Sequence, residues 1–549
     1  MNEEINTRCI PLVLGVTGHR DITPGDARRA REVVRGEIRK LAEHYPYTPI
    51  ELLSSLAAGA DRIVAEVALE EGIPLTVILP MKSELYEEDF TPEEVTEYRE
   101  LLARAANVFV APEVEDHAEG RDFLYRQAGI YVAAHSHALI ALWDGSEPKR
   151  GGCGTAEIVD IKLNGMISLN KTVSFSPEKG FVIHIPVRRA GVEPFPERTI
   201  TPKYLGDEKT FKRVLARTEE FNRETAGSLR QSPRKRSVGH EKDSTVKEQK
   251  TGNDRAFERM ASVGCAADFC SVRGAKRHRI TVGLIAVMAT LLTMSFLLYD
   301  EANMHYLIVG CGVMIVGIYV LNLLARKRDF HRKYLDYRVL AEALRVQTAL
   351  IEAGFYAETY EMLSWAQKLE TPWISRALAA ICVYDPGSLK LTGSTDNWIN
   401  GQLAYHRRAV VRAKAKSKAN DRIVRAAVAI TVAVYTAALV FEIFWAGTFG
   451  GSASLSEVDA EFVRTIFKLA TGSLSAISLF AGSYYGKLSL DQWARDSERM
   501  VLLYEEANAS KENCRDLGEL CVSLAREELS ENMRWYAYQS DNGPDTPIS

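Results

Sequence analysis

The stretch I-T-V-G-L-I-A-V-M-A-T-L-L-T-M-S-F-L-L-Y, Ile280 to Tyr299, decides the class of this protein because it contains no charged residue. A helix needs about 20 apolar residues to cross a bilayer core of about 30 Å. Comparable apolar stretches cover Tyr306–Ala325, Ala426–Trp445 and Leu469–Tyr485. The sequence therefore predicts four transmembrane helices, arranged as two hairpins in an all-α membrane region with cytosolic helical stalks.

The distribution of basic residues predicts how these stretches are oriented. Lys276–Arg279 precede the first pair and Arg326–Arg328 follow it, whereas the connection Asp300–His305 contains no Lys or Arg. Eight Lys and Arg residues precede the second pair between positions 407 and 425. Positively charged flanks stay on the cytoplasmic side of a membrane. We therefore expect a multi-pass protein of the cell inner membrane with both termini in the cytoplasm.

The fourth stretch carries small and hydroxyl-bearing residues on one helix face. Thr471, Ser475, Ser478 and Gly482 are spaced i, i+4, i+7 and i+11. Such a stripe suits either close packing of helices or the wall of a water-filled pore. Glu442, an acid inside the third stretch, either reaches the membrane surface or faces a conduit. A pore would need several copies of a four-span chain, so this hypothesis predicts a homo-oligomer.

Length and composition exclude several classes of function. A chain of 549 residues is too long for one core and predicts at least two domains. The formal net charge of −4 shows no basic excess of the kind that binds nucleic acid. The eight cysteines are scattered without a C-x-x-C pair, which favours free thiols over disulfides or a metal site. His135 and His137 are too few for a metal site, so neither a metal nor a cofactor is expected.

The chain is expected to divide into four parts. Residues 1–227 are predicted to form an α/β ligand-sensing domain, and residues 228–254 form a charged linker too polar to bury a core. Residues 255–370 and 371–549 each combine charged helical segments with one pair of apolar stretches, and the last part ends in a cytosolic helix.

Short apolar strands alternate with helical segments in the first part, which predicts a Rossmann-like parallel sheet with helices on both faces. The expected strands are Ile10–Val16, Ile50–Ser54, Leu75–Leu79, Asn107–Val110 and His137–Leu142. The expected helices are Pro24–His44, Ala60–Glu71, Pro92–Ala105, Arg121–His135 and Thr155–Leu163. Such sheets bind ligands beyond the carboxyl ends of their strands, so the loops at that edge are the candidate site.

The first candidate loop is G-V-T-G-H-R-D, which begins at Gly15. Gly15 and Gly18 permit close approach of a ligand to the backbone, and Thr17 offers a hydroxyl. His19 and Arg20 can meet a phosphate or a carboxylate.

The second candidate loop is S-S-L-A-A-G-A-D-R-I, in which Ser54 and Ser55 end a strand and Gly59 begins a helix. Amides at a helix start favour an anion. Asp61 would either cap this helix or accept a hydrogen bond from a ribose hydroxyl.

The third candidate loop is W-D-G-S-E-P-K-R-G-G-C-G-T-A-E-I, which begins at Trp143. Its glycine run leads into a helix, whose amides and dipole suit a phosphate. The candidate ligand-binding residues of this loop are Asp144, Gly145, Gly152, Gly154, Thr155 and Glu157. None of the three loops is a P-loop or a G-x-G-x-x-G dinucleotide motif.

Three of these motifs together resemble the SLOG superfamily, a Rossmann-like group that includes LOG phosphoribohydrolases, DprA and the nucleotide-sensing regions of TRPM channels. The resemblance covers about Ile10–Ile185 and rests on G-V-T-G-H-R, G-A-D-R-I-V-A-E and G-G-C-G-T-A-E, the last being similar to the P-G-G-x-G-T-x-x-E signature of LOG enzymes. The segments Y-R-V-L-A-E-A-L-R-V-Q and W-I-N-G-Q-L-A-Y-H look like the SLATT group of membrane effectors. These resemblances imply a role in bacterial antiphage defence, in which a nucleotide signal triggers membrane disruption or pore formation (abortive infection).

Two hypotheses follow. In the first, a nucleotide-derived ligand, ADP-ribose-like or a cyclic nucleotide, binds the cleft and alters the packing of helices in the lipid bilayer. Arg20 would meet its phosphate, and Asp61 or Asp144 its ribose hydroxyls. In the second, the chain is a membrane-tethered LOG-like nucleotide N-glycosidase, in which Glu157 stabilises an oxocarbenium-like centre. Tyr86–Phe90 is expected to be a solvated loop or a lid over the cleft.

Overall fold

The computed structural model describes residues 7–113, 120–148, 154–165, 179–190, 199–229, 252–301, 304–389, 395–445, 456–487, 490–511, 514 and 516–541. The chain folds into two compact units. The first comprises Met1–Cys270, Arg338–Thr395 and Cys521–Ser530, and the second comprises Ser271–Tyr337, Asp396–Leu520 and Glu531–Ser549. The first unit thus includes a segment that follows the first two apolar stretches in the sequence.

The described part of the first unit contains a seven-stranded sheet with the order β4-β3-β2-β1-β5-β6-β7. The strands are β1 (Leu12–Gly18), β2 (Ile50–Ser54), β3 (Leu75–Leu79), β4 (Asn107–Val110), β5 (Ala138–Trp143), β6 (Phe181–Pro186) and β7 (Lys203–Gly206). Neighbouring strands are parallel except for β6 and β7, which are antiparallel. The predicted α/β class and the five predicted strands are confirmed, and β6 and β7 extend the sheet beyond them.

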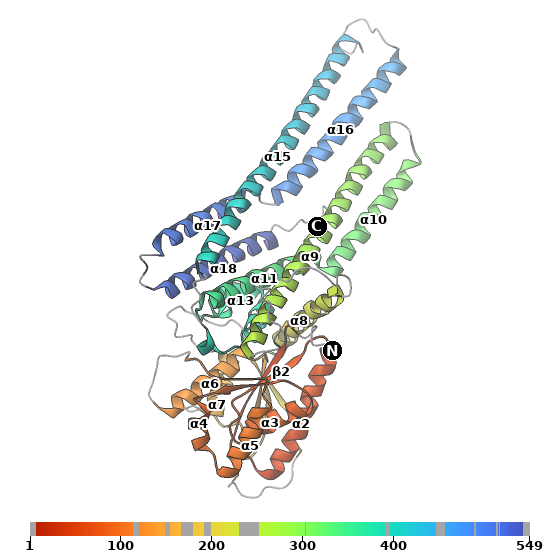
Figure 1. The fold of residues 1–549 in the computed structure, drawn as a ribbon. Coiled ribbons are helices and arrows are strands. Elements are labelled where there is room, and N and C mark those ends of the chain that lie inside the picture. Colours follow the sequence, from red (N-terminus) through yellow and green to blue (C-terminus); the bar gives the residue numbers. More distant parts are fainter. Residues whose placement is uncertain are drawn as a thin grey trace. The chain divides into compact units, whose positions relative to one another are not determined.

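Helices cover both faces of this sheet (Figure 1). On one face lie α2 (Pro24–His44), α3 (Ala60–Glu70), α5 (Pro92–Ala103) and α8 (Glu208–Leu229). On the other face lie α6 (Arg121–His135), α7 (Thr155–Asn164) and α14 (Pro372–Ile381). Both faces of β1 are buried, with Leu12 and Leu14 packed on one side and Val13 on the other, as a central parallel strand requires. The helix α14 shows that the second face is completed by residues from much later in the chain.

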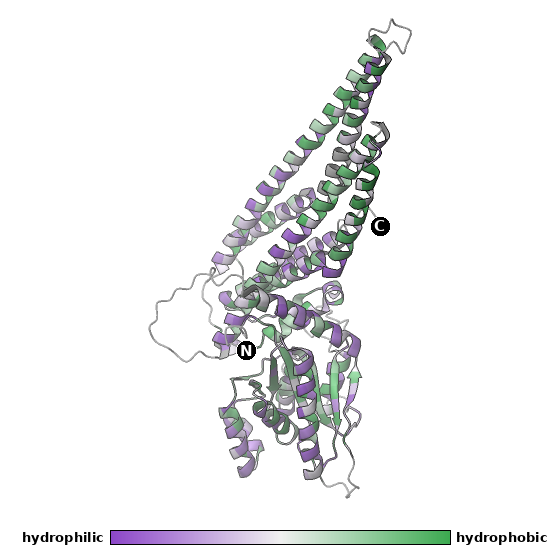
Figure 2. Cartoon of the chain, turned by 90° about the vertical axis from the view of Figure 1, so that its right-hand side faces the viewer, coloured by the Kyte–Doolittle hydropathy of each residue, from purple (hydrophilic) through white to green (hydrophobic). Residues whose placement is uncertain are grey.

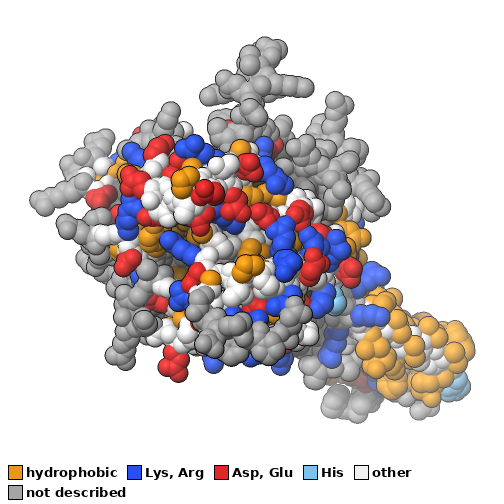
Figure 3. Space-filling model, turned by 90° about the horizontal axis from the view of Figure 1, so that it is seen from below, with side chains coloured by type: hydrophobic (Ala, Val, Ile, Leu, Met, Phe, Trp, Pro, Cys, Tyr) orange, Lys and Arg blue, Asp and Glu red, His pale blue; other side chains and the backbone are white. Residues whose placement is uncertain are grey.

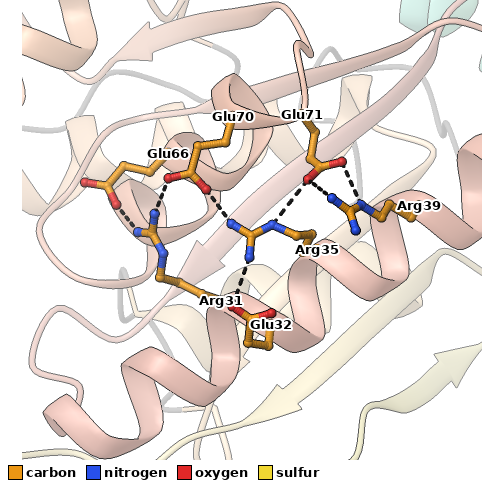
Figure 4. A network of polar contacts seen from close by, with 7 residues as sticks. All are labelled: Arg31, Glu32, Arg35, Arg39, Glu66, Glu70 and Glu71. Carbon is orange, nitrogen blue, oxygen red and sulfur yellow. Dashed lines mark hydrogen bonds and ion pairs between the residues drawn. The ribbon is translucent and has the colours of Figure 1, made fainter.

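A ladder of ion pairs joins α2 to α3 on the surface (Figure 4). Arg31, Arg35 and Arg39 are spaced one helical turn apart on α2 and bond to Glu66, Glu70 and Glu71 on α3. The Arg39 guanidinium donates two hydrogen bonds of 2.9 Å to the Glu71 carboxylate. Single exposed ion pairs contribute about 0–1 kcal/mol, so this network chiefly fixes the orientation of the two helices.

The segment Tyr86–Phe90 is not a solvated loop. Its first residue is the last residue of α4 (Ser83–Tyr86), and the next three form the short helix η1 (Glu87–Asp89). Tyr86 is completely buried, and its ring lies 4.8 Å from the Phe90 ring and 5.8 Å from the Tyr98 ring. Two aromatic residues in a five-residue run supply enough apolar surface to fold it onto the sheet domain. The alternative of a lid that closes over the cleft stays a prediction.

The remaining described helices of the chain are mostly long. They are α9 (Gly252–Glu301), α10 (Leu307–Arg328), α11 (Phe330–Ala353), α12 (Thr359–Met362), α13 (Trp365–Glu370), η2 (Pro386–Ser388), α15 (Thr395–Phe444), α16 (Glu457–Lys487), α17 (Leu490–Ser510) and α18 (Leu517–Asp541). In the second unit, Arg407 of α15 pairs with Glu505 of α17, and Lys414 pairs with Glu498. Part of the basic charge before the third apolar stretch is therefore neutralised by acids of α17.

Three stretches of the described chain are long and apolar enough to cross a membrane: Asn253–Tyr299, Leu307–Ala353 and Thr395–Phe444. Large apolar side chains on these helices are exposed, among them Val309 and Val313, at 70% and 68% exposed. In Figure 2 the hydrophobic residues of the long helices gather toward one end and the hydrophilic ones toward the other. These features indicate a membrane-associated protein. The fourth expected span, 469–485, lies in α16 and stays a prediction, as does the arrangement of four spans in two hairpins.

Candidate functional site

The strand order reverses direction between β1 and β5, which lie side by side at the centre of the sheet. The chain passes from β1 toward β2, β3 and β4 on one side, and from β5 toward β6 and β7 on the other. Loops that leave two such strands diverge and open a crevice beyond their carboxyl ends, which is where ligands of open α/β sheets bind. The first and third candidate loops follow these two strands, so the topology places both at the crevice.

The first candidate loop is held between β5 and the start of α3. The His19 amide donates to the Leu142 carbonyl at 3.0 Å, and the Ala60 amide donates to the His19 carbonyl at 3.0 Å. A Cβ atom on Gly18 would meet the Ala60 Cβ at 2.3 Å, and one on Gly59 would meet the Arg20 carbonyl oxygen at 2.3 Å. These two glycines therefore allow the loop and the helix to pack backbone against backbone.

The candidate glycines differ in what lies beside them. Gly15 faces protein, since a Cβ there would stand 2.8 Å from a Val132 methyl group. Gly145, with φ of +91°, meets only a His184 ring atom at 3.9 Å, and nothing lies within 4 Å of a Cβ on Gly154. Within the described residues, Gly145 and Gly154 thus leave their backbone open to a ligand, whereas Gly15, Gly18 and Gly59 serve packing. Gly152 lies outside the described residues.

His19 and Asp144 join the loops that follow β1 and β5. The His19 Nε2 lies 3.2 Å from an Asp144 carboxylate oxygen and 3.1 Å from the Asp144 backbone nitrogen. Burial raises the pKa of Asp144, but hydrogen bonds from Ser146 and His19 outweigh it and hold the pKa below its ordinary value. The Asp144 side chain is 34% exposed, so it can accept a hydrogen bond from a bound ligand. Thr17, the next to last residue of β1, is half-buried.

Arg20 leaves the first loop toward α6. Its guanidinium carbon lies 5.0 Å from the centre of the Tyr125 ring, within the range of a cation–π contact. The Tyr125 hydroxyl in turn donates to Asp89 of η1, and Arg121 pairs with the same carboxylate. The cation predicted to meet a phosphate is therefore held by α6 and by the aromatic segment around Tyr86.

The second candidate loop is strained and closes on its own acid. Leu56 is completely buried with φ of +53°, a left-handed conformation that costs a residue with a Cβ about 1–2 kcal/mol. The Asp61 carboxylate accepts from the Ser55 amide at 3.2 Å and from the Ser54 hydroxyl at 3.4 Å. Burial raises the pKa of Asp61 to about 6, although these bonds and one from the Ala57 backbone lower it. A carboxyl group that titrates near neutrality is typical of functional sites.

Arg62, beside Asp61, is a buried charge at the candidate site that the sequence analysis did not single out. It is 2% exposed, and its guanidinium donates to the Leu56 carbonyl at 3.3 Å and to the Glu94 carbonyl at 2.8 Å. Arg62 therefore stabilises the strained turn at Leu56. An arginine on the buried face of an otherwise apolar helix, A-D-R-I-V-A-E, is the signal that could have identified it.

A second buried charge, Asp26 of α2, also escaped the sequence analysis. It is fully buried and accepts from the Arg188 side chain at 2.9 and 3.0 Å and from the Arg188 amide at 3.0 Å. The Arg188 guanidinium, together with Arg29, holds the pKa of Asp26 well below its usual range, against the effect of burial. The Thr23 amide donates to the Arg188 carbonyl, so this pair anchors the loop after β1 to the end of β6.

Glu157 does not stand free at the crevice. It lies in the first turn of α7, where Arg126 of α6 donates to its Oε1 atom. Within the described residues its Oε2 atom is buried and has no hydrogen-bond partner. Thr155, also in this turn, is half-buried, and the preceding Gly154 caps the helix without a side-chain bond. Glu157 thus joins α7 to α6.

The predicted membrane residues are placed only in part. Glu442 has a partner: Arg464 of α16 donates hydrogen bonds to both carboxylate oxygens, at 2.6 and 2.9 Å. Close packing of α16 against α9 occurs at Gly472, where a Cβ would meet a Leu297 methyl group at 2.7 Å. Of the predicted stripe, Thr471 is half-buried and Ser475 is exposed, while the side chains of Ser478 and Gly482 lie outside those described.

The face of the molecule in Figure 3 shows Lys and Arg side chains interspersed with Asp and Glu. It is therefore not a uniformly basic surface of the kind that binds a polynucleotide. Among the described residues, no group of three or more His, Cys, Asp or Glu side chains could hold a metal ion.

Comparison with known proteins gives no identification. No protein-family model matches the chain, and no curated protein matches its sequence. The resemblance to the SLOG and SLATT groups stays a prediction, and the role of each residue has to be argued from its geometry.

Proposed function

We propose that this chain is a sensor for a nucleotide-derived small molecule and that ligand binding changes how its membrane helices pack, so that the bilayer is opened or disrupted. The observation that carries the proposal is the crevice at the reversal of strand order. It combines an arginine, an exposed carboxylate and a helix start that no other described residue covers within 4 Å, in a chain that also has membrane-length helices.

Each part of the crevice suits one part of a nucleotide. Arg20 carries the positive charge that a phosphate needs, and the amides and dipole at the start of α7, next to Gly154, favour an anion. Asp144 is the better acceptor for ribose hydroxyls, because its side chain is 34% exposed whereas Asp61 is only 6% exposed. An ADP-ribose-like molecule or a cyclic nucleotide carries both a phosphate and a ribose.

The proposal extends to the context that the SLOG and SLATT resemblances imply. The chain would then act in bacterial antiphage defence as a homo-oligomer in the inner membrane, with both termini in the cytoplasm. A ligand can switch such a protein only through its different affinity for two states, and a near-complete switch needs about 5.5 kcal/mol.

Dye release from liposomes that contain the full-length protein tests this proposal. ADP-ribose-like and cyclic nucleotides are added to the wild type, to Arg20→Ala and to the matched control Arg104→Ala, which changes an exposed arginine at the end of α5. We expect ligand-stimulated release from the wild type and the control, and at least a tenfold higher ligand requirement for Arg20→Ala. If dye release is equally fast without ligand, and equally fast from the Arg20→Ala protein, the sensing proposal is wrong.

The alternative, a nucleotide N-glycosidase, needs a carboxylate that can approach the glycosidic bond. Glu157 is the candidate, but one of its oxygens bonds to Arg126 and the other is buried. No observation on the described residues favours hydrolysis, so we place sensing first. Free base released from a nucleoside monophosphate by the wild type and not by Glu157→Gln would reverse this order.

A further inference from the structure

Helix α6 touches the candidate site at one end and a later segment of the chain at the other. Near its start, Tyr125 lies under Arg20, and Arg126 bonds to Glu157 of α7. At its last residue, the His135 Nε2 lies 3.1 Å from a Glu358 carboxylate oxygen. The helix has 15 residues and is about 22 Å long at 1.5 Å per residue. It therefore connects two places that lie more than two hundred positions apart in the sequence.

The contact at the far end is buried and specific. His135 and Glu358 are 2% and 5% exposed, and the Tyr356 hydroxyl donates to the same Glu358 oxygen at 2.7 Å. The His135 ring stacks on Tyr131 with 3.9 Å between ring centres and meets Tyr360 edge-on at 5.5 Å. Burial lowers the pKa of His135, but the Glu358 carboxylate outweighs it and raises the pKa. A buried carboxylate that loses such a partner is strongly unfavourable, so the two groups must move together.

The segment that contains Glu358 is fixed to the helix that follows the second membrane stretch. Gln347 of α11 is completely buried, and its side chain donates to the Ala357 carbonyl at 3.0 Å. Its Oε1 atom accepts from the Thr359 amide at 2.8 Å and from the Thr359 hydroxyl at 3.0 Å. These three bonds hold both sides of Glu358. The stretch Leu307–Ala353, which includes α11, is one of the three long enough to cross a membrane.

We propose that α6 is the element that couples the candidate ligand site to the membrane helices, with the buried contact between His135 and Glu358 as its output and Gln347 as the attachment to α11. A shift of Arg20 or of the first turn of α7 on ligand binding displaces the start of α6. A packed helix transmits this displacement to its other end because close-packed interiors yield little. The inference rests on the proposed function in its direction of signalling, but the coupling itself is a property of the fold.

Hydrogen exchange of the full-length protein in detergent, without any ligand, tests the coupling. Glu358→Gln keeps the shape of the side chain and removes its charge, and Tyr356→Phe is a milder variant that removes one bond to Glu358. The matched control is Glu342→Gln, whose carboxylate pairs with Arg338 and Arg345 of its own helix α11.

We expect Glu358→Gln to speed exchange at least threefold in residues 83–90 and 19–21, next to the ligand site, and Tyr356→Phe to do so to a smaller extent. The control should stay within twofold of the wild type in these two segments. If Glu358→Gln and Tyr356→Phe change exchange only around residues 131–136 and 355–361, the coupling through α6 is wrong.

Nucleotide binding to the same proteins separates this inference from the proposed function. A variant Glu358→Gln that binds nucleotide like the wild type but no longer releases dye supports both. A wild type that binds no nucleotide overturns the proposed function, while the exchange experiment still decides whether the two ends of α6 are coupled.

Discussion

Replacement of Gly59 by alanine is the sharpest test of how the crevice is built. Gly59 has φ of +78°, and a Cβ atom there would lie 2.3 Å from the Arg20 carbonyl oxygen and 2.6 Å from the His19 carbonyl oxygen. Both neighbours are backbone atoms, which cannot turn away as a flexible side chain can. The substitution must therefore move the first loop away from α3 or force the start of α3 to unwind.

The expected cost is the sum of two effects. The left-handed conformation costs a residue with a Cβ about 1–2 kcal/mol, and overpacking of a tight contact costs about 1–3 kcal/mol. The free energy of unfolding of the Gly59→Ala variant should thus fall by about 2–5 kcal/mol. At about 2–4 °C per kcal/mol for a domain of this size, the Tm should fall by about 4–20 °C.

Two other glycines separate these effects. Gly72 has φ of +73° and nothing within 4 Å of a Cβ, so Gly72→Ala should show only the conformational cost. Gly36 lies inside α2 with nothing within 4 Å, so Gly36→Ala should stabilise the protein by about 0.8–1 kcal/mol. Thermal unfolding of the full-length proteins in detergent, followed by tryptophan fluorescence, gives the order of stability of the three glycine variants. A Gly59→Ala protein no less stable than Gly72→Ala would refute the close contact between the first loop and α3.

Three further predictions concern buried or paired charges. Arg62→Met should lower the free energy of unfolding by about 2–3 kcal/mol, because the Leu56 and Glu94 carbonyls lose a charged donor, whereas Arg104→Met should have little effect in the same denaturation experiment. Asp61 has a pKa of about 6 in the folded protein, above its ordinary value of 3.8, so its ionisation lowers the stability of the fold as the pH rises from about 4 to 6. The stability of Asp61→Asn relative to the wild type should therefore increase by up to about 3 kcal/mol between pH 4 and pH 7. A difference in stability that does not change with pH would contradict this. In a double-mutant cycle, Glu442→Gln and Arg464→Gln should show a coupling energy of about 0.5–3 kcal/mol, and strictly additive changes in stability would mean that the two side chains do not pair.

The elements that the sequence predicts well are those with a continuous apolar pattern. β2, β3 and β4 have the predicted bounds, and β1 and β5 are shifted by one or two residues toward their carboxyl ends. Strands buried on both faces read as unbroken apolar runs, which makes them easy to locate. The outer strand β7, K-Y-L-G, was missed because it is mostly exposed at the sheet edge and has no such run. The strand β6, F-V-I-H-I-P, was missed although it is a buried and mostly apolar run.

The loops of the candidate site were predicted, but the roles of their residues were not. Strand ends can be located along the chain, so the three loops follow from the fold class alone. Whether a glycine faces a ligand or another part of the protein depends on contacts such as that of Gly18 with Ala60. These contacts join residues far apart in the sequence, and no local pattern contains them. The partners of Asp26, Glu157 and Glu442 could not be predicted for the same reason.

The largest difference concerns where the sheet domain ends. α14 lies in the core of the first unit, although it follows two apolar stretches in the sequence, and its Ile374 and Leu378 are completely buried. Trp373 packs near Phe221 of α8, with 6.3 Å between ring centres. A single sequence contains no sign of this, because a short amphipathic helix looks the same whether it packs on a neighbouring helix or on a distant sheet.

This packing predicts that residues 1–229 do not form a stable domain alone. Full burial of Trp373, Ile374, Leu378 and Ile381 contributes about 1.5–3 kcal/mol each, or about 6–12 kcal/mol together. A domain of this size has only about 5–15 kcal/mol of net stability. The isolated fragment should therefore bind ANS and unfold without a sharp transition, and addition of residues 338–395 through a flexible linker should restore a cooperative transition. A fragment 1–229 that unfolds cooperatively at the Tm of the full-length protein would show that the sheet does not depend on α14. The position of α14 in the sequence has a second consequence. A sheet that needs residues 372–381 cannot fold before the apolar stretches 280–299 and 306–325 have been synthesised.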